Sequence, residues 1–533
     1  MYRQWSCINN PYEIPPEDCD IPFRISQLPT EDGEFKTLQI LILLTLDYLY
    51  QNKFRRYKDT CVRQVLTSDK RETKCWEVEC EIKDVPWRLA KKESNAKFWM
   101  ELTKHTTNAQ SVTRYLTECQ DNQFNEISKN RSLWSFNNGI FVGKVYDSDT
   151  GKYTCKFIPY DTSEFLSFKF PYGEPQQSAK YFDCDFDTYE NASGWYEIPT
   201  PCLQSILDYQ GFTEEVSKWV YCMLGRMCFN VGDMDNWQVL LFLQGVARSG
   251  KSTITKLIAQ FYAPEDIRTL SNNIERQFGL QSIYDGFLFI APEIKKDIKL
   301  EQAEFQSMVS GESVSVARKF EKAKSIDWIT PGLMAGNETP EWKDNAGSIM
   351  RRLFTLKFEN QVEEADCNLD AKLKAEIPAL LYKCVKAYLQ YSQLYGSRDI
   401  WNVVPNYFKD VQIDINKETN PLLHFLEEGG LTFDPKSECS FEDFSSDFRT
   451  HVGLYNLRRG MNLTRDAYSV LFAKRKISVV YRGGYDPETK RTVAKTRWVI
   501  GIDLPNKEKY TPNTIQPHGR ITTMGRTNTA DSA

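Results

Sequence analysis

A glycine-rich segment carries the clearest chemical pattern in this sequence. From Gly245 to Ser252 the chain reads G-V-A-R-S-G-K-S, which fits the spacing G-x-x-x-x-G-K-[ST] of a phosphate-binding loop. In such a loop the backbone N–H groups face the phosphates, the lysine reaches the β- and γ-phosphates, and the hydroxyl coordinates Mg²⁺. We therefore expect ATP and Mg²⁺ as cofactors and a catalytic role for Lys251. The residues predicted to bind the nucleotide are Gly245, Val246, Ala247, Arg248, Ser249, Gly250, Lys251, Ser252 and Thr253.

The sequence around this loop predicts the elements that hold it. Residues 239–243 (V-L-L-F-L) form an apolar run typical of a buried strand, and residues 253–262 (T-I-T-K-L-I-A-Q-F-Y) have helical apolar periodicity. A helix leaving the loop places the positive end of its dipole at the phosphates. The alternative is a glycine-rich turn with an incidental lysine. Because such loops occur in kinases, transporters, packaging motors and helicases, the loop alone does not choose between them.

A carboxylate follows the next predicted strand. Residues 287–291 (F-L-F-I-A) read as a buried strand that ends at Pro292 and Glu293. A carboxylate in this place can polarise the attacking water or hold Mg²⁺ together with Ser252. Pro292 occupies the position of the first acid in the usual Asp-Glu pair, so we expect Glu293 to act largely alone, with Asp297 as a candidate helper. The alternative is an exposed glutamate without a catalytic role.

Two further polar sites come later in the chain. Asn337 follows an apolar segment, in A-G-N-E-T-P, where its amide would hold the attacking water or the γ-phosphate. Arg351 and Arg352 precede another apolar run, L-F-T-L-K-F, and an arginine here is suited to act across a subunit boundary on a neighbour's nucleotide. The alternative for both arginines is an ordinary salt-bridged start of a strand.

Residues 314–324 (V-S-V-A-R-K-F-E-K-A-K) alternate in a way that predicts a β-hairpin with a basic tip. Arg318, Lys319 and Lys322 would lie near the turn, where cations can follow the backbone of single-stranded DNA. A charged strand edge that prevents aggregation explains the same residues equally well.

The C-terminal part of the chain is basic, although the whole chain is acidic. Lys and Arg number 67 against 72 Asp and Glu, a net charge of −5, yet residues 445–500 contain 12 basic and 4 acidic residues, or +8. Two predicted helices followed by a basic hairpin read as a winged helix. Arg482, Lys490 and Arg491 would lie on its wing and contact DNA phosphates. The alternative is a winged helix that binds protein.

The order of these motifs resembles that of superfamily-three helicases. More narrowly, it is similar to the helicase half of the helicase–primase (NTPase) family of poxviruses and other large DNA viruses. The matching segments are Q-G-V-A-R-S-G-K-S-T, P-E-I, K-L-E-Q-A-E-F-Q-S-M-V-S-G-E, A-G-N-E-T-P and M-R-R-L-F, with S-F-N-N-G-I-F upstream. The likeness covers residues 130–400 and is weak before residue 120. Pro292 departs from members of the superfamily that carry paired acids.

This resemblance implies an AAA+-like ring, expected to be a hexamer, with ATP at the subunit junctions. Glu293 would position water, Asn337 would sense the γ-phosphate, and Arg352, or else Arg351, would complete a neighbour's site. The ring would act on single-stranded and forked DNA as the replicative helicase of a viral or mobile-element genome, inside the host cytoplasm or nucleus. Two alternatives stay open: a P-loop ATPase that remodels or packages DNA without unwinding it, and an ATP-switched initiator that binds origin DNA.

The sequence lacks the residues that a primase or a nicking enzyme needs. Asp183, Asp185 and Asp187 have the spacing of catalytic acids, but no histidine follows them before His424, and His105 is the single histidine upstream. We therefore expect priming by a separate primase, or by a part of the polypeptide that this sequence does not contain. A separate polymerase is a further expected partner.

Length and composition set the outer limits of the fold. A chain of 533 residues with 41% hydrophobic and 26% charged residues fits several globular domains and excludes collagen-like or wholly disordered chains. The most apolar run, residues 38–50, is too short to span a bilayer, so we expect a buried helix in a soluble, intracellular protein without membrane contact.

The expected fold class is multidomain α/β with an AAA+-like P-loop core. The expected domains are an N-terminal region of unknown role (1–120), a β-rich domain (121–200), a helical collar (201–235), the ATPase core (236–365), a helical lid or linker (366–420), a basic winged-helix-like domain (421–504) and a disordered tail (505–533).

Overall fold

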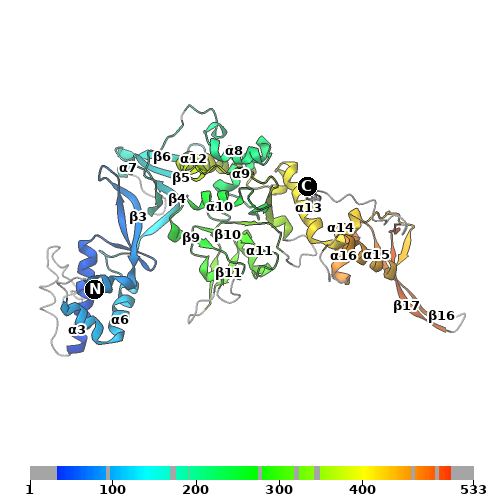
Figure 1. The fold of residues 1–533 in the computed structure, drawn as a ribbon, viewed down its shortest axis with the longest axis horizontal. Coiled ribbons are helices and arrows are strands. Elements are labelled where there is room, and N and C mark those ends of the chain that lie inside the picture. The colour runs from blue at the N-terminus through cyan, green and yellow to red at the C-terminus, as the bar shows by residue number, and fades with distance from the viewer. Residues whose placement is uncertain are drawn as a thin grey trace, which may run out of the picture. The chain divides into compact units, whose positions relative to one another are not determined.

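The computed structural model describes most of the chain, which divides into two compact units. The described residues are 33–91, 96–167, 176–189, 191–273, 279–316, 323–340, 342, 349–455, 457, 463–486 and 491–505. The first unit comprises Met1–Trp342 and Arg351–Val411, and the second comprises Lys343–Met350 and Gln412–Ala533. Both units combine helices with strands (Figure 1). The expectation of a multidomain α/β protein is confirmed.

The first described element is a buried helix. α3 (Gly33–Gln51) contains the apolar run at residues 38–50, and its Leu41, Leu46 and Leu49 are almost fully buried. They pack with three further helices, α4 (Val85–Ala90), α5 (Ala96–Lys104) and α6 (Thr106–Glu118). The prediction of a buried helix is confirmed. Within the described parts of the chain, we find no helix with the length and apolar character needed to cross a membrane.

One seven-stranded sheet connects the N-terminal region with the region that follows it. Its order is β1-β2-β3-β7-β4-β5-β6, with β7 parallel to both β3 and β4. The strands are β1 (Arg55–Tyr57), β2 (Thr60–Leu66), β3 (Glu72–Glu81), β4 (Ser128–Ser135), β5 (Gly139–Asp147), β6 (Lys152–Pro159) and β7 (Gln176–Tyr181). The domain boundary expected after residue 120 is therefore corrected: it falls inside a single sheet, because β7 joins strands from both sides of it.

A five-stranded parallel sheet forms the centre of the first unit. Its strands are β8 (Leu240–Gly245), β9 (Ile267–Thr269), β10 (Leu288–Ile294), β13 (Gly332–Gly336) and β14 (Leu353–Phe358), in the order β14-β8-β13-β10-β9. All neighbouring strands run parallel. Strands of this kind are buried on both faces and need apolar residues throughout, which explains the runs L-L-F-L, L-F-I-A and L-F-T-L. The strands predicted at residues 239–243 and 287–291 are confirmed.

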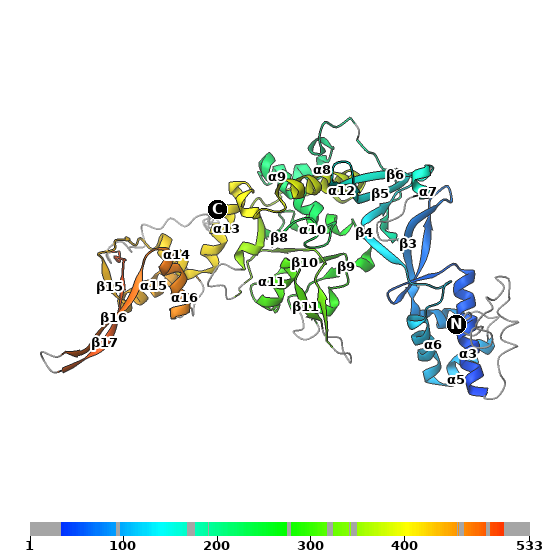
Figure 2. The ribbon, with the colours of Figure 1, turned by 180° about the vertical axis from the view of Figure 1, so that it is seen from behind.

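Helices cover this core sheet. They are α8 (Pro201–Tyr209), α9 (Glu214–Arg226), α10 (Lys251–Ala259), α11 (Gln302–Ser310) and α12 (Leu369–Tyr395). α9 and α12 pack closely, since a Cβ atom added at Gly225 would lie 1.9 Å from the carbonyl oxygen of Cys384. In Figures 1 and 2, α9 and α12 lie above β8 and β10, and the hairpin of β11 (Ser313–Val316) and β12 (Lys324–Asp327) lies below them.

A buried ionic cluster fastens the N-terminal sheet to the core sheet. The Asp266 side chain, just before β9, is fully buried and accepts hydrogen bonds from Tyr57, Lys58 (3.0 Å) and Lys129 (3.4 Å). Arg131 on β4 is also buried and donates to main-chain carbonyl oxygens of the core. Buried charges need such partners, because desolvation costs several kcal/mol per ion. The cluster therefore fixes how the two sheets meet.

The second unit is a small α/β domain. It contains the end of α13 (Asn406–Thr419), then α14 (Pro421–Glu428), α15 (Phe441–Leu454), α16 (Arg465–Lys474) and an antiparallel sheet of β15 (Glu438–Ser440), β17 (Arg491–Ile500) and β16 (Ser478–Asp486). Phe425, Phe444 and Phe472 pack together in its core. The two helices and the hairpin predicted in the C-terminal part of the chain are present as α15, α16 and the β16–β17 pair. The expected tail lies, from residue 506 onward, outside the described residues.

Candidate functional site

The loop between β8 and α10 contains two glycines with positive φ angles, which glycine adopts easily. Gly245 has φ +155°, and a Cβ atom added there would lie 2.0 Å from the carbonyl oxygen of Phe358. Gly250, which precedes the first residue of α10, has φ +99°. Positive φ values carry little steric cost for glycine because it has no Cβ atom. The two glycines of the sequence pattern are therefore required by the turn itself.

The side chain of Lys251 is folded into this loop. It is 9% exposed, and its Nζ donates hydrogen bonds to the carbonyl oxygens of Gly245 (2.8 Å) and Val246 and to the Ser249 hydroxyl (3.3 Å). Burial lowers the pKa of the Lys251 ammonium, an effect that the Glu293 carboxylate opposes. The loop thus holds an ammonium group inside the turn. A phosphate group would compete with these carbonyl oxygens for the Lys251 ammonium. The hydrogen-bond donors of the loop therefore fit a polyphosphate.

Segments far away in the sequence brace the loop. Gln210, at the end of α8, donates to the carbonyl oxygens of Ser249 (3.1 Å) and Asn360 (2.8 Å) and accepts from the Asn360 N–H (3.0 Å). Val362 N–H donates to the Arg248 carbonyl oxygen (2.9 Å). These residues belong to no recognisable motif, and no sequence signal identified Gln210. Their contacts hold the loop in its turn without a ligand.

The strand that carries Glu293 contains a β-bulge. Ala291 pairs with Met334 and Ile294 with Gly336, so β10 has one more residue than β13 between these pairs. Pro292 lies in this bulge. A proline cannot donate to a strand ladder, and a bulge is a place in a sheet where that loss is tolerated. The bulge explains why a proline can stand before Glu293.

An asparagine from another segment orients the end of this strand. The Asn272 side chain donates to the Glu293 carbonyl oxygen and accepts from the Lys295 N–H (2.9 Å). The Glu293 residue itself is exposed. Asn272 therefore holds the main chain from Glu293 to Lys295, while the carboxylate of Glu293 is accessible from solvent.

Asn337 follows β13 and is exposed at the same edge of the sheet. Its neighbour Gly336 packs on the bulge, because an added Cβ atom would lie 2.6 Å from the Ile294 carbonyl oxygen. β13 lies between β8 and β10. The sheet order therefore brings Asn337 between the loop and Glu293, at the carboxyl ends of the strands, where ligands bind in open α/β sheets.

The two arginines lie at the opposite edge. β14 pairs with β8 from Leu353↔Leu240 to Phe358↔Gly245, so Arg351 and Arg352 precede the amino end of β14. At about 3.3 Å per residue, this strand separates them from the loop by roughly 17 Å or more. Neither arginine can serve the loop of its own chain without a large rearrangement.

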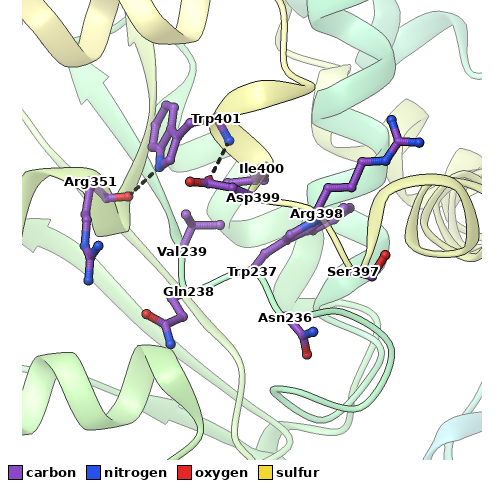
Figure 3. Close-up of a pocket in the computed structure, with 10 residues that line it drawn as sticks. All are labelled: Asn236, Trp237, Gln238, Val239, Arg351, Ser397, Arg398, Asp399, Ile400 and Trp401. Carbon is purple, nitrogen blue, oxygen red and sulfur yellow. Dashed lines mark hydrogen bonds between the residues drawn. The ribbon is translucent and has the colours of Figure 1, made fainter.

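The two arginines differ in exposure. Arg352 is 8% exposed, and its Nη2 lies 3.5 Å from the side-chain oxygen of Gln238. Arg351 is exposed, and its carbonyl oxygen accepts a hydrogen bond from Trp401 Nε1 (2.9 Å; Figure 3). An accessible guanidinium on a fixed main chain suits contact with another molecule, so the structure favours Arg351 over Arg352 for that role.

The predicted basic hairpin has its strands, but its tip cannot be described. β11 and β12 pair in antiparallel fashion from Ser313↔Asp327 to Val316↔Lys324. Arg318, Lys319 and Lys322 lie outside the described residues. The hairpin itself is confirmed, and its contact with DNA stays a prediction.

The predicted wing residues have different surroundings. Arg482 forms an ion pair with Glu438, donating to Oε1 at 2.6 Å, and its guanidinium lies 5.0 Å from the centre of the Trp498 ring. Lys490 and the side chain of Arg491 lie outside the described parts. A DNA contact by Arg482 would have to break this pair. Exposed ion pairs contribute little stability, so the cost of breaking it is small.

Comparison with known proteins gives one family match and remote structural neighbours. Residues 243–352 match a family described as a family of unknown function, DUF5906. This segment runs from the end of β8 to Arg352 and includes Glu293 and Asn337. The A-form apo structure of the NrS-1 C-terminal region is 9% identical, with a TM-score of 0.39, covering 86% of this chain and 98% of that chain. Another apo structure of that region is 12% identical, with a TM-score of 0.35, covering 69% and 95%. These TM-scores are too low to establish a shared fold.

Proposed function

We propose that the chain is an ATP-dependent DNA helicase that works as a ring. The observation that carries this proposal is the meeting of three groups at the carboxyl edge of the core sheet: the Gly245–Ser252 loop, Glu293 and Asn337. The sheet order places the amide between the loop and the carboxylate. Such an arrangement is what hydrolysis of a nucleoside triphosphate requires, because it binds the phosphates and positions a water beside them.

Each group has a distinct task in this proposal. The loop N–H groups and the Lys251 ammonium bind the phosphates, and the ammonium leaves the loop carbonyl oxygens to do so. Ser252 and Glu293 would hold Mg²⁺, which supplies charge neutralisation for the β- and γ-phosphates. Glu293 also accepts a hydrogen bond from the attacking water and orients it. Asn337 donates its amide N–H to the γ-phosphate or to that water.

The positions of the arginines support assembly of several copies. Arg351 and Arg352 lie at the amino edge, roughly 17 Å or more from the loop of their own chain. A group there can act on a nucleotide held by a second copy, which requires head-to-tail contacts. Contacts of this type close into a ring when the rotation between copies allows it. We expect a hexamer.

The DNA contacts in this proposal come from two basic regions. The β11–β12 hairpin, with Arg318, Lys319 and Lys322 at its tip, would follow single-stranded DNA, and the C-terminal unit, with its charge of +8 between residues 445 and 500, would bind DNA phosphates. A separate primase and polymerase would supply the remaining steps of replication inside the cell. AAA+-like and winged-helix folds are part of the same proposal.

Strand displacement tests the proposed function. The assay measures release of a labelled strand from a forked duplex with ATP, for the wild type, Lys251→Ala and the control Lys256→Ala, whose side chain is exposed on the same helix. We expect the wild type and the control to unwind and Lys251→Ala to fail. ATP hydrolysis on DNA without unwinding would instead support a remodelling or packaging ATPase. ATP-dependent binding of duplex DNA without hydrolysis would support an initiator.

A further inference from the structure

A cavity lies between α12 and the strand β6 of the N-terminal sheet. Its volume is about 330 Å³, within the range of roughly 300–1,000 Å³ that ligand sites occupy. α12 and β6 border it, together with the segment of residues 192–198. In Figures 1 and 2, α12 lies beside β6. The lining residues on which the argument depends are Tyr153, Trp195, Lys386, Gln390 and Gln393.

The spacing of these residues explains why they share one cavity. Lys386, Gln390 and Gln393 are separated by four and three positions, so they lie on one face of α12. On the sheet, Tyr153 of β6 is the direct cross-strand partner of Tyr146 on β5. Direct partners lie on the same face of a sheet. Tyr146 therefore extends the face of the sheet to which Tyr153 belongs.

Two glutamines of α12 hold the frame of the cavity, and each keeps one polar atom for a ligand. Trp195 Nε1 donates to Gln390 Oε1, and Gln393 Nε2 donates to the Tyr153 carbonyl oxygen. Among the described residues, Gln390 Nε2 and Gln393 Oε1 have no hydrogen-bond partner. One is a donor and the other an acceptor, and both residues are exposed. Such a pair of groups can bind the edge of an unpaired nucleobase.

The charge of the cavity favours an anion. Of the described residues that line it, Lys386 alone is charged. Its Nζ donates to the Tyr382 hydroxyl (3.0 Å) and lies 4.6 Å from the centre of the Tyr382 ring. An ammonium group has three N–H donors, so this hydrogen bond leaves two for a ligand. A phosphate group bound there would be attracted by Lys386 and would meet no carboxylate in the described lining.

Exposed aromatic rings continue from the cavity along the sheet. Tyr153 and Tyr146 are 37% and 57% exposed, and their ring centres lie 5.3 Å apart. The Lys144 ammonium lies 4.8 Å from the centre of the Tyr153 ring and forms an ion pair with Asp233 (2.6 Å). These contacts hold the Tyr153 ring in place. Exposed rings of this kind are stacking surfaces for the bases of a single strand.

We propose that this cavity and the Tyr146–Tyr153 pair bind single-stranded nucleic acid. One base binds the free amide atoms of Gln390 and Gln393, its phosphate binds Lys386, and the next base stacks on Tyr146. A duplex is excluded as the ligand, because its bases are already paired and stacked on each other. A free nucleotide would not use Tyr146. The inference rests on the proposed function for the class of ligand, and it adds a site outside the two basic regions.

Binding of fluorescent oligo(dT) by the full-length chain, measured by anisotropy without ATP, tests this inference. The variants are Lys386→Gln and Tyr146→Leu, and the control is Lys374→Gln, which removes an exposed cation from the same helix. We expect each variant to bind about fivefold or more weakly, and the control to match the wild type. ATP hydrolysis without DNA should be unchanged in all three proteins.

The salt dependence of binding separates a DNA contact from a structural role of Lys386. A lysine that binds a phosphate of a single strand contributes about 0.7 to the slope of log affinity against log salt concentration. Lys386→Gln should therefore reduce this slope by about 0.7, and Lys386→Arg should restore it. Tyr146→Leu should lower the affinity without changing the slope. An unchanged slope in Lys386→Gln would overturn the inference.

Photocrosslinking locates the bound strand directly. Oligonucleotides that carry 5-iodouracil react with aromatic side chains that contact the base, and mass spectrometry of the peptides identifies these side chains. We expect crosslinks at Tyr146 or Tyr153. Crosslinks confined to the β11–β12 hairpin and the C-terminal unit would contradict the inference.

The remaining outcomes separate this inference from the proposed function. Wild-type affinity of Lys386→Gln and Tyr146→Leu for both oligo(dT) and oligo(U) would assign the cavity to another class of ligand, such as a peptide, and would leave the proposed function standing. Equal affinity of the wild type for deoxythymidine monophosphate and oligo(dT) would assign it to a free nucleotide. If the wild type binds oligo(dT) through this cavity but hydrolyses no ATP, the proposed function fails and this inference stands.

Discussion

The carboxyl and amino edges of the core sheet carry two different kinds of candidate site. At the carboxyl edge, the functional groups are presented by local backbone features: a turn that requires Gly245, a bulge at Pro292 and the end of β13. At the amino edge, the main chain of Arg351 is held by a hydrogen bond from Trp401, in the turn after α12, and that turn packs against the start of β8. The first kind of site depends on a few consecutive residues, and the second depends on which distant segments pack together.

The largest expected effect tests the chemistry of the carboxyl edge. Glu293→Gln should lower ATP turnover about 10²–10⁴-fold, because the amide accepts a water proton poorly, while nucleotide affinity stays near the wild type. Steady-state hydrolysis and binding of a fluorescent nucleotide measure the two quantities. The control is Glu338→Gln, which alters an exposed ion pair with Lys296 near the same edge. Retained turnover in Glu293→Gln would remove the catalytic assignment from this edge.

The next effect tests whether backbone shape defines the carboxyl edge. Gly245→Ala should lower the free energy of unfolding by about 1–3 kcal/mol, because its Cβ atom would lie 2.0 Å from the Phe358 carbonyl oxygen. Nucleotide affinity should fall with it. The control is Gly194→Ala, where an added Cβ atom meets nothing within 4 Å, and its stability should change by less than about 0.5 kcal/mol. Urea unfolding compares them, and equal stability of the two variants would contradict the strained-turn account.

A pair of substitutions sharpens the assignment at the amino edge. Arg352→Gln should destabilise the chain by roughly 1–3 kcal/mol, because Arg352 is 8% exposed and its removal disturbs buried polar groups. Arg351→Gln should leave stability within about 0.5 kcal/mol and lower turnover without changing nucleotide affinity. Urea unfolding and hydrolysis assays measure both variants. A stable Arg352→Gln protein that has lost turnover would reverse the order of the two arginines.

The smallest expected effect concerns Gln210, which supports the loop at the carboxyl edge. Gln210→Ala removes the hydrogen bonds to Ser249 and Asn360, and should cost about 1 kcal/mol of unfolding free energy. Nucleotide affinity should fall a few-fold, because the loop loses its support. Ser205→Ala, on the exposed side of the same helix, serves as the control. Unchanged affinity in Gln210→Ala would show that the turn holds its shape alone.

The sequence alone predicted the elements of the carboxyl edge, because each of them is formed by a few consecutive residues. The spacing from Gly245 to Ser252 fixes the turn, and apolar runs identify the strands on either side of it. The predicted helices and strands around the loop, the β11–β12 hairpin and the C-terminal helices all form. Periodicity reports the burial of one short segment at a time, so it identifies such elements without any knowledge of their neighbours.

Sequence reasoning failed where pairing partners decide the outcome. The single sheet that crosses residue 120 depends on β7 pairing with both β3 and β4, and pairing of separate strands is invisible to periodicity. For the same reason, the sequence did not predict the hydrogen bonds from Gln210 to the loop or the β-bulge at Pro292.

By itself, then, the sequence determined the loop, its flanking strand and helix, and the residue types available for the proposed phosphate and DNA contacts. The tertiary structure decided that Asn337 lies between the loop and Glu293, that Arg351 is exposed while Arg352 is buried, and that Trp401 holds the main chain of Arg351. The physical reason is that strand order, register and packing depend on contacts between residues far apart in the chain. No window of the sequence contains both partners of such a contact.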